Sequence, residues 1–381
     1  MAVAHELLAP SVVTGIVSRI FTPGNTLQRL FNMQIGGSAV YQVSGRAWTY
    51  DIFDNVRTIA PGRAPATGPQ NTAPNPVGRV TGTFPRSYEK VPLNYEMLHN
   101  LRQMGKDAGT RDRLGAVYIE NQARFVKTRA DNFREFELAA LLTQGQMAMQ
   151  FDGDNWIPVR SLGANAGFNI SWQIPAGNLN INTSFAAGLN MTGAGNIITA
   201  SWATVSTDIP GNLVSISQAF QELVGAPLAI VVTDSTQWLN ILSNTRVKDL
   251  AGSVNTPYAE YTMEQLRGPD GNPIPLYEGR IKALPWLRFW IYDGGLTING
   301  VYTKFWTNLA TFLVEPTPMW IRMQEGSEPV KENPQAQAVE RFGMFSWIRE
   351  WDEPARLELH CLQNCIPELR VPKGVAISTI A

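Results

Sequence analysis

The residue types that most often carry chemistry are few in this chain, and they lie far apart. The three histidines are His5, His99 and His360, and none has a carboxylate or a nucleophile at a spacing typical of a catalytic site. General acid–base catalysis uses histidine more than any other residue. The Gly-x-Ser-x-Gly pattern of an exposed catalytic serine is also absent. We therefore expect no catalytic residues and no enzymatic activity.

Metal ligation is the next chemistry to consider. His360, Cys361 and Cys365 could supply three ligands, but no fourth lies nearby, and the ligands of zinc sites normally come in spaced pairs. Positions 361 and 365 share a face of a strand, which favours two small core residues. Residues 152–155 resemble the start of a calcium loop without its glutamate. The sequence predicts no metal site.

Cofactor-binding loops are matched only in part. Residues 104–107 resemble the end of a phosphate-binding loop, but Asn100 stands where the first glycine belongs, and Asp107 replaces the Ser or Thr. Residues 193–195 lack the third glycine of a dinucleotide fingerprint and lead into a strand-like run. We expect turns at both places, and no cofactor.

Size and composition limit the class of protein. A chain of 381 residues usually folds as two or three compact units, and a hydrophobic content of 44% is ample for their cores. The 31 basic and 32 acidic residues nearly cancel, so no global field favours nucleic acid or an acidic membrane as a partner. Two cysteines are too few for a disulfide framework. No apolar run reaches the length of a membrane helix, and no signal peptide is expected.

The elements expected in the first quarter of the chain are extended. Residues 1–45 show no sustained period and are interpreted as an arm that packs on another surface. Strand-like segments at 46–59 and 79–93 flank residues 61–78, which carry five prolines and three glycines. Together they predict a long two-stranded loop. Because an isolated two-stranded ribbon is marginal in water, we expect this loop to lie on another surface, with a solvated hairpin as the alternative.

A long helix follows, predicted over 110–143, with Thr110 as its N-cap and Gly145 just beyond its end. One predicted stripe is apolar: Leu114, Val117, Tyr118, Phe125, Phe133, Phe136, Ala140 and Leu141. The opposite predicted face is charged: Arg111, Asp112, Arg113, Glu120, Arg124, Lys127, Arg129, Asp131, Arg134, Glu135 and Glu137. At 1.5 Å per residue, the helix would be on the order of 50 Å long.

Residues 147–207 are predicted to form short strands and turns, and an α/β unit is predicted to follow them. Asp208 is a predicted N-cap for a helix that ends at Gly225. A buried strand is expected at 228–232 and a short helix from Ser235. Three further segments are predicted as strands: a pair at 281–292 and 301–314, and a closing strand on which Leu357, Leu359 and Cys361 share a face.

This order of parts resembles the major capsid proteins of tailed bacteriophages with the HK-97-type fold, in particular the capsid protein E family of lambda-like phages. The segments that carry the resemblance are EKVPLNYEMLHNLRQMG (89–105), NFREFELAALLTQG (132–145), GAPLAIVVTDSTQWLNILSNTRVKD (225–249) and WDEPARLELHCLQNCIPELRVPKGV (351–375). They are similar to the end of that family's extended loop, its spine helix, its axial core and its final strand, in that order along the chain.

The resemblance implies an α+β fold with five parts. These are an N-terminal arm at 1–45, an extended β-hairpin loop at 46–95, a peripheral domain at 96–208 with the spine helix at 110–143, an axial domain at 209–344, and a return strand of the peripheral domain with the C-terminal tail at 345–381.

It also implies a function and partners. Copies would assemble into pentamers and hexamers of an icosahedral shell that encloses double-stranded DNA, bound without sequence specificity. We expect a virion protein, assembled in the bacterial host cytoplasm, with a portal and no membrane. Because only about 45 residues precede the extended loop, a separate scaffolding protein, or none, is expected. A decoration protein is a further candidate partner.

Charge along the chain suggests where copies meet. Residues 55–90 carry five basic residues and one acid, whereas residues 315–358 carry nine acids and five bases. We therefore predict that the loop of one subunit lies over the acidic region of its neighbour. The predicted contact residues are Arg57, Arg63, Arg79, Arg86 and Lys90 on the loop, and Glu325, Glu328, Glu332 and Glu340 on the neighbour.

Two other classes stay open at this point. An encapsulin-like compartment would share the fold and enclose an enzyme in place of a genome. A carbohydrate-binding or adhesin module would explain the Asn-, Thr- and Gly-rich strands and the 11 tryptophans. That module would be a monomer or small oligomer, whereas both shell proteins would form hollow particles visible by negative-stain microscopy.

Overall fold

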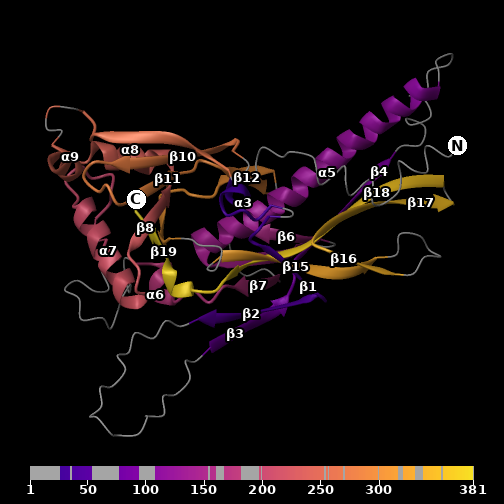
Figure 1. The fold of residues 1–381 in the computed structure, drawn as a ribbon, viewed down its shortest axis with the longest axis horizontal. Coiled ribbons are helices and arrows are strands. Elements are labelled where there is room, and N and C mark those ends of the chain that lie inside the picture. Colours follow the sequence, from indigo (N-terminus) through magenta and orange to yellow (C-terminus); the bar gives the residue numbers. More distant parts are fainter. Residues whose placement is uncertain are drawn as a thin grey trace, which may run out of the picture. The chain divides into compact units, whose positions relative to one another are not determined.

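A computed structural model of the chain separates it into two compact units (Figure 1). Unit 1 comprises Met1–Trp48, Gly82–Leu138 and Arg322–Glu368, and unit 2 comprises Thr49–Thr81, Ala139–Ile321 and Leu369–Ala381. The structure describes residues 26–34, 37–53, 77–93, 108–152, 155–159, 167–181, 197–198, 200–252, 255, 257–268, 271–298, 300–315, 321–330, 338–352 and 355–380. The mixture of helices and sheets confirms the predicted α+β class.

Unit 1 is built on a six-stranded sheet. Its main path runs β1 (Val40–Val43), β15 (Ile321–Val330), β18 (Ala355–Leu369) and β17 (Met344–Asp352). Two more strands join it: β16 (Val339–Phe342) pairs with β15, and β4 (Arg86–Leu93) pairs with β18. The β1–β15 pair is parallel, so the N-terminal part of the chain is tied to a strand formed near its end.

The long helix α5 (Ala108–Gln144) spans 37 residues, which confirms the helix predicted over 110–143. Its residues Ala123, Val126 and Ala130 form one cluster with apolar side chains of β4, β17 and β18. Those strand residues are Leu93, Met344, Ile348, Leu357, Leu359 and Cys361. The predicted shared face of Leu357, Leu359 and Cys361 is therefore confirmed, and it is the face that packs on α5.

The predicted division of α5 into an apolar and a charged face is wrong. Val117 and Phe125, assigned to the apolar stripe, are 46% and 53% exposed. Five residues of the predicted charged face are instead buried: Lys127, Asp131, Arg134, Glu135 and Glu137. The reason is that these charges find partners inside: Lys127 and Asp131 pair with each other, Glu135 accepts from α3 (Thr26–Leu30), and Arg134 and Glu137 contact residues of the sheet.

The predicted two-stranded loop is confirmed in its first part only. Strand β2 (Ala47–Phe53) pairs with β3 (Val77–Thr83), and the loop between them, 54–76, lies outside the described residues. The Trp48 ring packs flat on this pair, because Gly82 leaves no Cβ in its path. Residues 86–93 do not continue the ribbon. They form β4, whose backbone pairs with β18 in the sheet of unit 1.

Unit 2 is built on a second six-stranded sheet, in the order β19 (Val375–Thr379), β14 (Leu309–Val314), β8 (Leu228–Thr233), β11 (Arg288–Ile291), β10 (Pro273–Ile281) and β9 (Tyr261–Arg267). Only β8 and β11 among these neighbours are parallel. The expected pairing of 281–292 with 301–314 is wrong, since β11 and β14 lie on opposite sides of β8. The reason is that the separate hairpin β12 (Gly295–Ile298) and β13 (Val301–Lys304) occupies the connection.

Three helices of unit 2 start where the sequence places polar caps. Asp208, Asp234 and Asn244 each accept a backbone N–H with the side chain, at the starts of α7 (Ile209–Leu223), α8 (Ser235–Ser243) and α9 (Thr245–Ala251). Such caps typically contribute about 1 kcal/mol each. The helices predicted after Asp208 and from Ser235, and the strand predicted at 228–232, are confirmed.

The region 147–207 contains the short strands expected of it. β5 (Gln146–Asp152) pairs antiparallel with β6 (Asn155–Val159) and with β7 (Gly167–Ser171), and the short helix α6 (Ala176–Leu179) follows. Asn178 of α6 donates to the carbonyl of Val375 at 2.9 Å. This bond ties the region to the start of β19, just after the 3-10 turn Pro372–Gly374.

The boundaries of the two units differ from the boundaries of the expected domains. Residues 139–208 group with unit 2, not with the helix and the return strand, and residues 322–344 group with unit 1. The physical reason is strand pairing: β15 belongs to the sheet of β1, β16 and β18, while β19 adds to the edge of β14. The assignment of peripheral and axial roles to these parts stays a prediction.

Candidate functional site

The basic residues of the predicted contact lie in different surroundings. Arg57 and Arg63 fall outside the described residues. Arg79 pairs with Asp51 within the β2–β3 hairpin, at 3.0 Å. Arg86 and Lys90 lie on β4 and contact acids of their own chain, Glu328 at 3.0 Å and Glu358 at 3.6 Å.

The acidic residues of the predicted contact are mostly buried within their own subunit. Glu325 and Glu328 have side chains only 5% and 6% exposed. Glu340 is exposed and accepts hydrogen bonds from Ser44 and Ser327, which lower its pKa from the ordinary value. Glu332 falls outside the described residues. Of the four acids, Glu340 alone among those described faces solvent, so the contact between subunits stays a prediction.

The interior of unit 1 holds a cluster of charges that sequence patterning placed at the surface. Arg134 of α5 is fully buried and donates to Glu325 of β15 at 2.9 Å and to the carbonyl of Met33 at 3.2 Å. Earlier on the helix, Lys127 pairs with Asp131 at 2.6 Å, and both side chains are buried. Charges survive burial only when paired and hydrogen-bonded, and these satisfy that condition.

Glu135 shows how α5 holds the N-terminal segment. Its two carboxylate oxygens accept the backbone N–H groups of Leu27 and Gln28, at 2.8 and 3.2 Å. These donors lie in the first turn of α3, where no partner exists within the helix. The Gln28 amide also donates to the carbonyl of Asp131 at 2.7 Å. Residues 26–30, expected to belong to an arm, are therefore fastened to their own spine helix.

Glu137 and Cys365 form the most deeply buried part of the cluster. The Cys365 thiol donates to Oε2 of Glu137 at 3.2 Å, and the Gln363 amide donates to Sγ at 2.9 Å. Burial raises the pKa of Glu137 well above its ordinary value, although the Cys365 hydrogen bond and the nearby Arg134 lower it. Burial likewise raises the pKa of Cys365. The predicted core role of Cys361 and Cys365 is confirmed, since both are buried and free.

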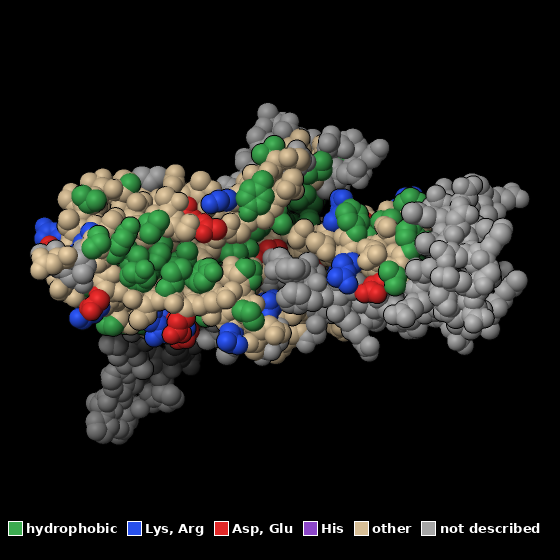
Figure 2. All heavy atoms as spheres, turned by 90° about the horizontal axis from the view of Figure 1, so that it is seen from above, with side chains coloured by type: hydrophobic (Ala, Val, Ile, Leu, Met, Phe, Trp, Pro, Cys, Tyr) green, Lys and Arg blue, Asp and Glu red, His purple; other side chains and the backbone are tan. Residues whose placement is uncertain are grey.

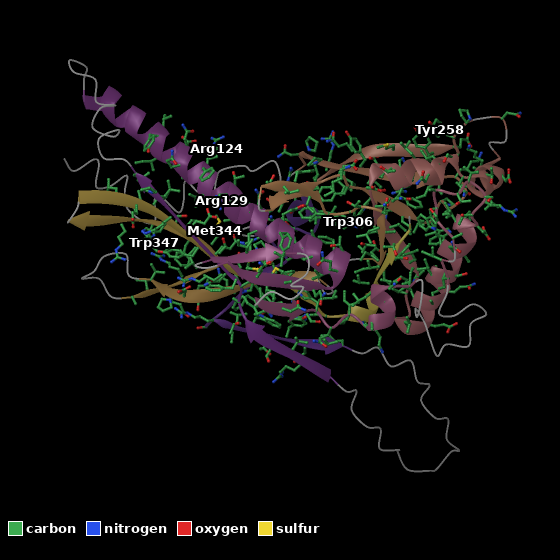
Figure 3. The ribbon with its side chains drawn as sticks, turned by 180° about the vertical axis from the view of Figure 1, so that it is seen from behind. Arg124, Arg129, Tyr258, Trp306, Met344 and Trp347 are labelled. Carbon is green, nitrogen blue, oxygen red and sulfur yellow. The ribbon has the colours of Figure 1, made fainter. Side chains whose placement is uncertain are left out.

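His360 lies in an aromatic stack on the sheet face away from α5. Its ring stacks on Trp347 at a centroid distance of 5.1 Å, and its Nδ1 lies 2.6 Å from the Tyr88 hydroxyl. Burial lowers the pKa of His360, although Glu358 nearby raises it. Figure 3 labels Trp347 on β17, together with Met344, which belongs to the cluster on α5. We interpret this histidine as a packed core residue.

An apolar surface covers part of unit 2, and we call it the β9 surface. It comprises Leu239 of α8, Tyr261 and Met263 of β9, and Tyr277 of β10, which are 43% to 52% exposed. Strand register places Tyr261, Met263 and Tyr277 on one face of the sheet. Figure 2 shows hydrophobic side chains gathered on this part of the molecule. Trp238 packs below them against Gly279, with its ring perpendicular to that of Tyr261.

In the described part of the chain, no group of three or more His, Cys, Asp or Glu side chains could hold a metal ion. No described helix has the length and apolar composition needed to cross a membrane.

The Arg134–Glu325 pair provides a stability prediction. Arg134→Met leaves the Glu325 carboxylate buried without its cation, so we expect the free energy of unfolding to fall by about 3–5 kcal/mol. Adding Glu325→Leu should recover most of that loss. Arg124→Met is the matched control, because Arg124 pairs with Glu120 on the exposed side of the same helix. Equal urea midpoints for the Arg134 and Arg124 variants would contradict the expectation.

Glu137 provides a pH prediction. Because its pKa is raised in the folded state, the folded chain holds a proton that the unfolded chain releases above about pH 4.5. The stability contribution is therefore present below pH 4.5 and is lost as pH rises. Glu137→Gln should remove up to about 1.4 kcal/mol per pH unit of this decline. Unfolding midpoints between pH 4 and 9 measure it. Glu340→Gln, an exposed acid with a lowered pKa, should leave the decline above pH 5 unchanged.

Comparisons with known proteins give similarity at the level of structure alone. No family model and no curated protein matches the chain. A prophage protein of Escherichia coli CFT073 described as a capsid protein is 16% identical, over 80% of each chain, with a TM-score of 0.45. A phage-related protein of Bordetella bronchiseptica RB50 is 10% identical over 97% of this chain and 96% of its own, with a TM-score of 0.48. An encapsulin of Synechococcus elongatus PCC 7942 is 7% identical over 90% and 84%, with a TM-score of 0.40.

Proposed function

We propose that this chain is a shell-forming structural protein, the major capsid protein of a tailed bacteriophage, which assembles into pentamers and hexamers around double-stranded DNA. The observation that carries the proposal is the β9 surface of unit 2, where an unpaired strand edge and an apolar face occur together. The order of hairpin, long helix, α/β unit and return strand supports it, because this order is the one expected of the HK-97-type fold.

The β9 edge is suited to contact with another chain. Among the described strands, β9 is the last of its sheet, and six of its seven side chains are exposed. Edge strands present unpaired N–H and C=O groups, and monomeric proteins usually cover or blunt them. Contiguous exposed apolar side chains likewise mark interaction sites.

A further copy of the chain is the occupant we propose for this surface. The charges of the chain nearly cancel, at 31 basic and 32 acidic residues, so identical subunits do not repel one another through a field of one sign. Head-to-tail contacts between identical chains close into rings when the rotation between neighbours allows it. Rings of five and six subunits are the form such closure takes in an icosahedral shell.

The other partners belong to the same proposal. They are a separate scaffolding protein, a portal, a decoration protein and packaged DNA, with the virion as location and the host cytoplasm as the place of assembly. Negative-stain microscopy of the purified protein tests the proposal directly, because a shell protein forms closed hollow particles. Nucleic acid inside particles from infected cells supports the phage function, whereas an enclosed enzyme supports the encapsulin-like alternative.

The β9 surface provides a prediction about assembly. Tyr261→Glu with Met263→Glu places two charges on the apolar face, and we expect particles to be lost while the subunit keeps its circular dichroism spectrum. Thr262→Glu is the matched control, because Thr262 is exposed on the opposite face of the same strand, across from Arg280. Sedimentation velocity measures the distribution of assemblies. Normal particles from the double variant would exclude this surface as a subunit contact.

We also propose the charge contact between neighbours, narrowed to the loop residues Arg63 and Arg79 facing Glu332 and Glu340 of the next subunit. Individual surface pairs contribute little, but a shell repeats them many times. Reversing Arg63 and Arg79 to Glu should impair shell formation and leave the subunit folded. Adding Glu332→Arg and Glu340→Arg should restore it. Unimpaired shells from the first variant, measured by the same sedimentation assay, would refute the contact.

A further inference from the structure

The face of the unit 1 sheet that points away from α5 presents cations and an aromatic ring. Strand register aligns Arg86, Tyr88 and Lys90 of β4 with Asn364, Leu362 and His360 of β18. It also aligns Arg349 of β17 with Glu358. Directly paired residues share a face of a sheet. We call Arg46, Arg86, Lys90, Arg349 and Tyr88 the cationic face, where Arg46 joins the group by sharing an acid with Arg86.

The cations of this face are exposed, and their acidic partners are not. The side chains of Arg46, Arg86 and Lys90 are 68%, 48% and 58% exposed, and Arg349 is exposed as well. The acids beneath, Glu328 and Glu358, are only 6% and 5% exposed. A molecule that approaches this face therefore meets positive charges first.

Two of these cations share one carboxylate. Arg46 and Arg86 both contact the same oxygen of Glu328, at 2.8 and 3.0 Å. Lys90 contacts Glu358, which stands opposite Arg349 in the strand register. These contacts hold the cations on the solvent side of the two buried carboxylates. The shared carboxylates also hold the cations in place, which lowers the entropic cost of ordering them around a ligand.

Tyr88 adds a flat, half-exposed surface between the cations. Its ring stacks on Trp347 at 6.0 Å with an angle of 11°, and the Arg86 guanidinium lies 4.9 Å above it. The Arg86 guanidinium is therefore fixed from two sides, by Glu328 and by this ring. Its remaining N–H groups can donate to an oxyanion, the geometry in which arginine binds phosphate.

We infer that the cationic face binds the phosphodiester backbone of nucleic acid without reading its sequence. The cations lie on a face of a sheet, and exposed Arg and Lys side chains there can contact phosphates, which carry no sequence information. This inference rests on the proposed function, because a shell that encloses DNA brings the cationic face and the nucleic acid together.

The alternative partner is an acidic surface of a neighbouring subunit, which the structure favours less. Glu328 and Glu358, the carboxylates in contact with the cations of this face, are buried beneath them, whereas Glu340 is exposed. Exposed acids of a neighbouring copy such as Glu120, Glu260 and Glu315 already pair with cations of their own chain, whereas nucleic acid offers a phosphate at every nucleotide. The experiment below makes this alternative one of its outcomes.

The test compares binding of the full-length protein to a mixed-sequence 30-base-pair duplex as the salt concentration rises. Phosphate contacts make the logarithm of affinity fall linearly with the logarithm of salt, by about one unit of slope per contact. The variant with Arg86→Gln, Lys90→Gln and Arg349→Gln should bind at least about tenfold more weakly at low salt and lose about two to three units of slope. Fluorescence anisotropy measures both quantities, with inorganic phosphate as a competitor.

Two control variants test whether the loss of binding is specific to the positive charges of the cationic face. Arg280→Gln with Lys282→Gln removes two exposed, acid-paired cations of unit 2 and should leave the slope unchanged. Arg86→Lys with Lys90→Arg and Arg349→Lys keeps the charges and should retain most of the slope. If the triple Gln variant does not fold, as judged by circular dichroism, the single variant Arg349→Gln should still lose about one unit of slope.

Three results would overturn the inference. The wild-type protein could fail to bind the duplex, or the triple Gln variant could bind with the wild-type slope. The variant could also lose particles while its DNA affinity stays unchanged, which would assign the cations to a neighbour's acids. Failure of the proposed function is recognised separately: the wild-type protein would then form no particles, yet its salt-dependent binding and the loss in the variant would persist.

Discussion

The buried pair of Arg134 and Glu325 is the interaction on which the rest of unit 1 depends. It joins the middle of α5 to β15, and Arg134 also holds the carbonyl of Met33. A buried guanidinium must keep every available partner, because an uncompensated charge in the interior costs several kcal/mol. The helix can therefore take only the rotation and the axial position that bring Arg134 to Glu325. In this position of the helix, Glu135 accepts a backbone N–H of α3, and Glu137 accepts the Cys365 thiol.

This constraint explains which parts of the fold could be predicted from the sequence. The caps of α7 and α8, the strand β8 and the length of α5 follow from local signals, namely Asp208, Asp234, an apolar run and the absence of proline. The rotation of α5 could not be predicted. Hydrophobic periodicity assumes that charge faces water, whereas here Lys127, Arg134 and Glu137 find partners inside.

The contact residues were harder to place than the elements, for a similar reason. A count of charges along the chain identified a basic and an acidic region, but it cannot tell a carboxylate at the surface from one beneath a strand. Glu325 and Glu328 are internal because β15 lies inside its sheet, a position fixed by pairing with β1 from far away in the sequence. The β9 surface was missed because Tyr261, Met263 and Tyr277 alternate like core residues, although they are 43% to 46% exposed in the structure.

The parallel pairing of β1 with β15 also has a consequence for the order in which the chain can fold. Val40 lies opposite Met323, and β4 pairs with a strand that ends at Leu369, so the unit 1 sheet needs residues from both ends of the chain. Contacts between such distant residues form slowly, because the intervening loop must close first. On the ribosome, which delivers the N-terminal residues long before β18, this sheet stays incomplete until β18 has been synthesised. A truncated chain therefore lacks a finished unit 1, which keeps incomplete subunits from presenting the surfaces of a mature one.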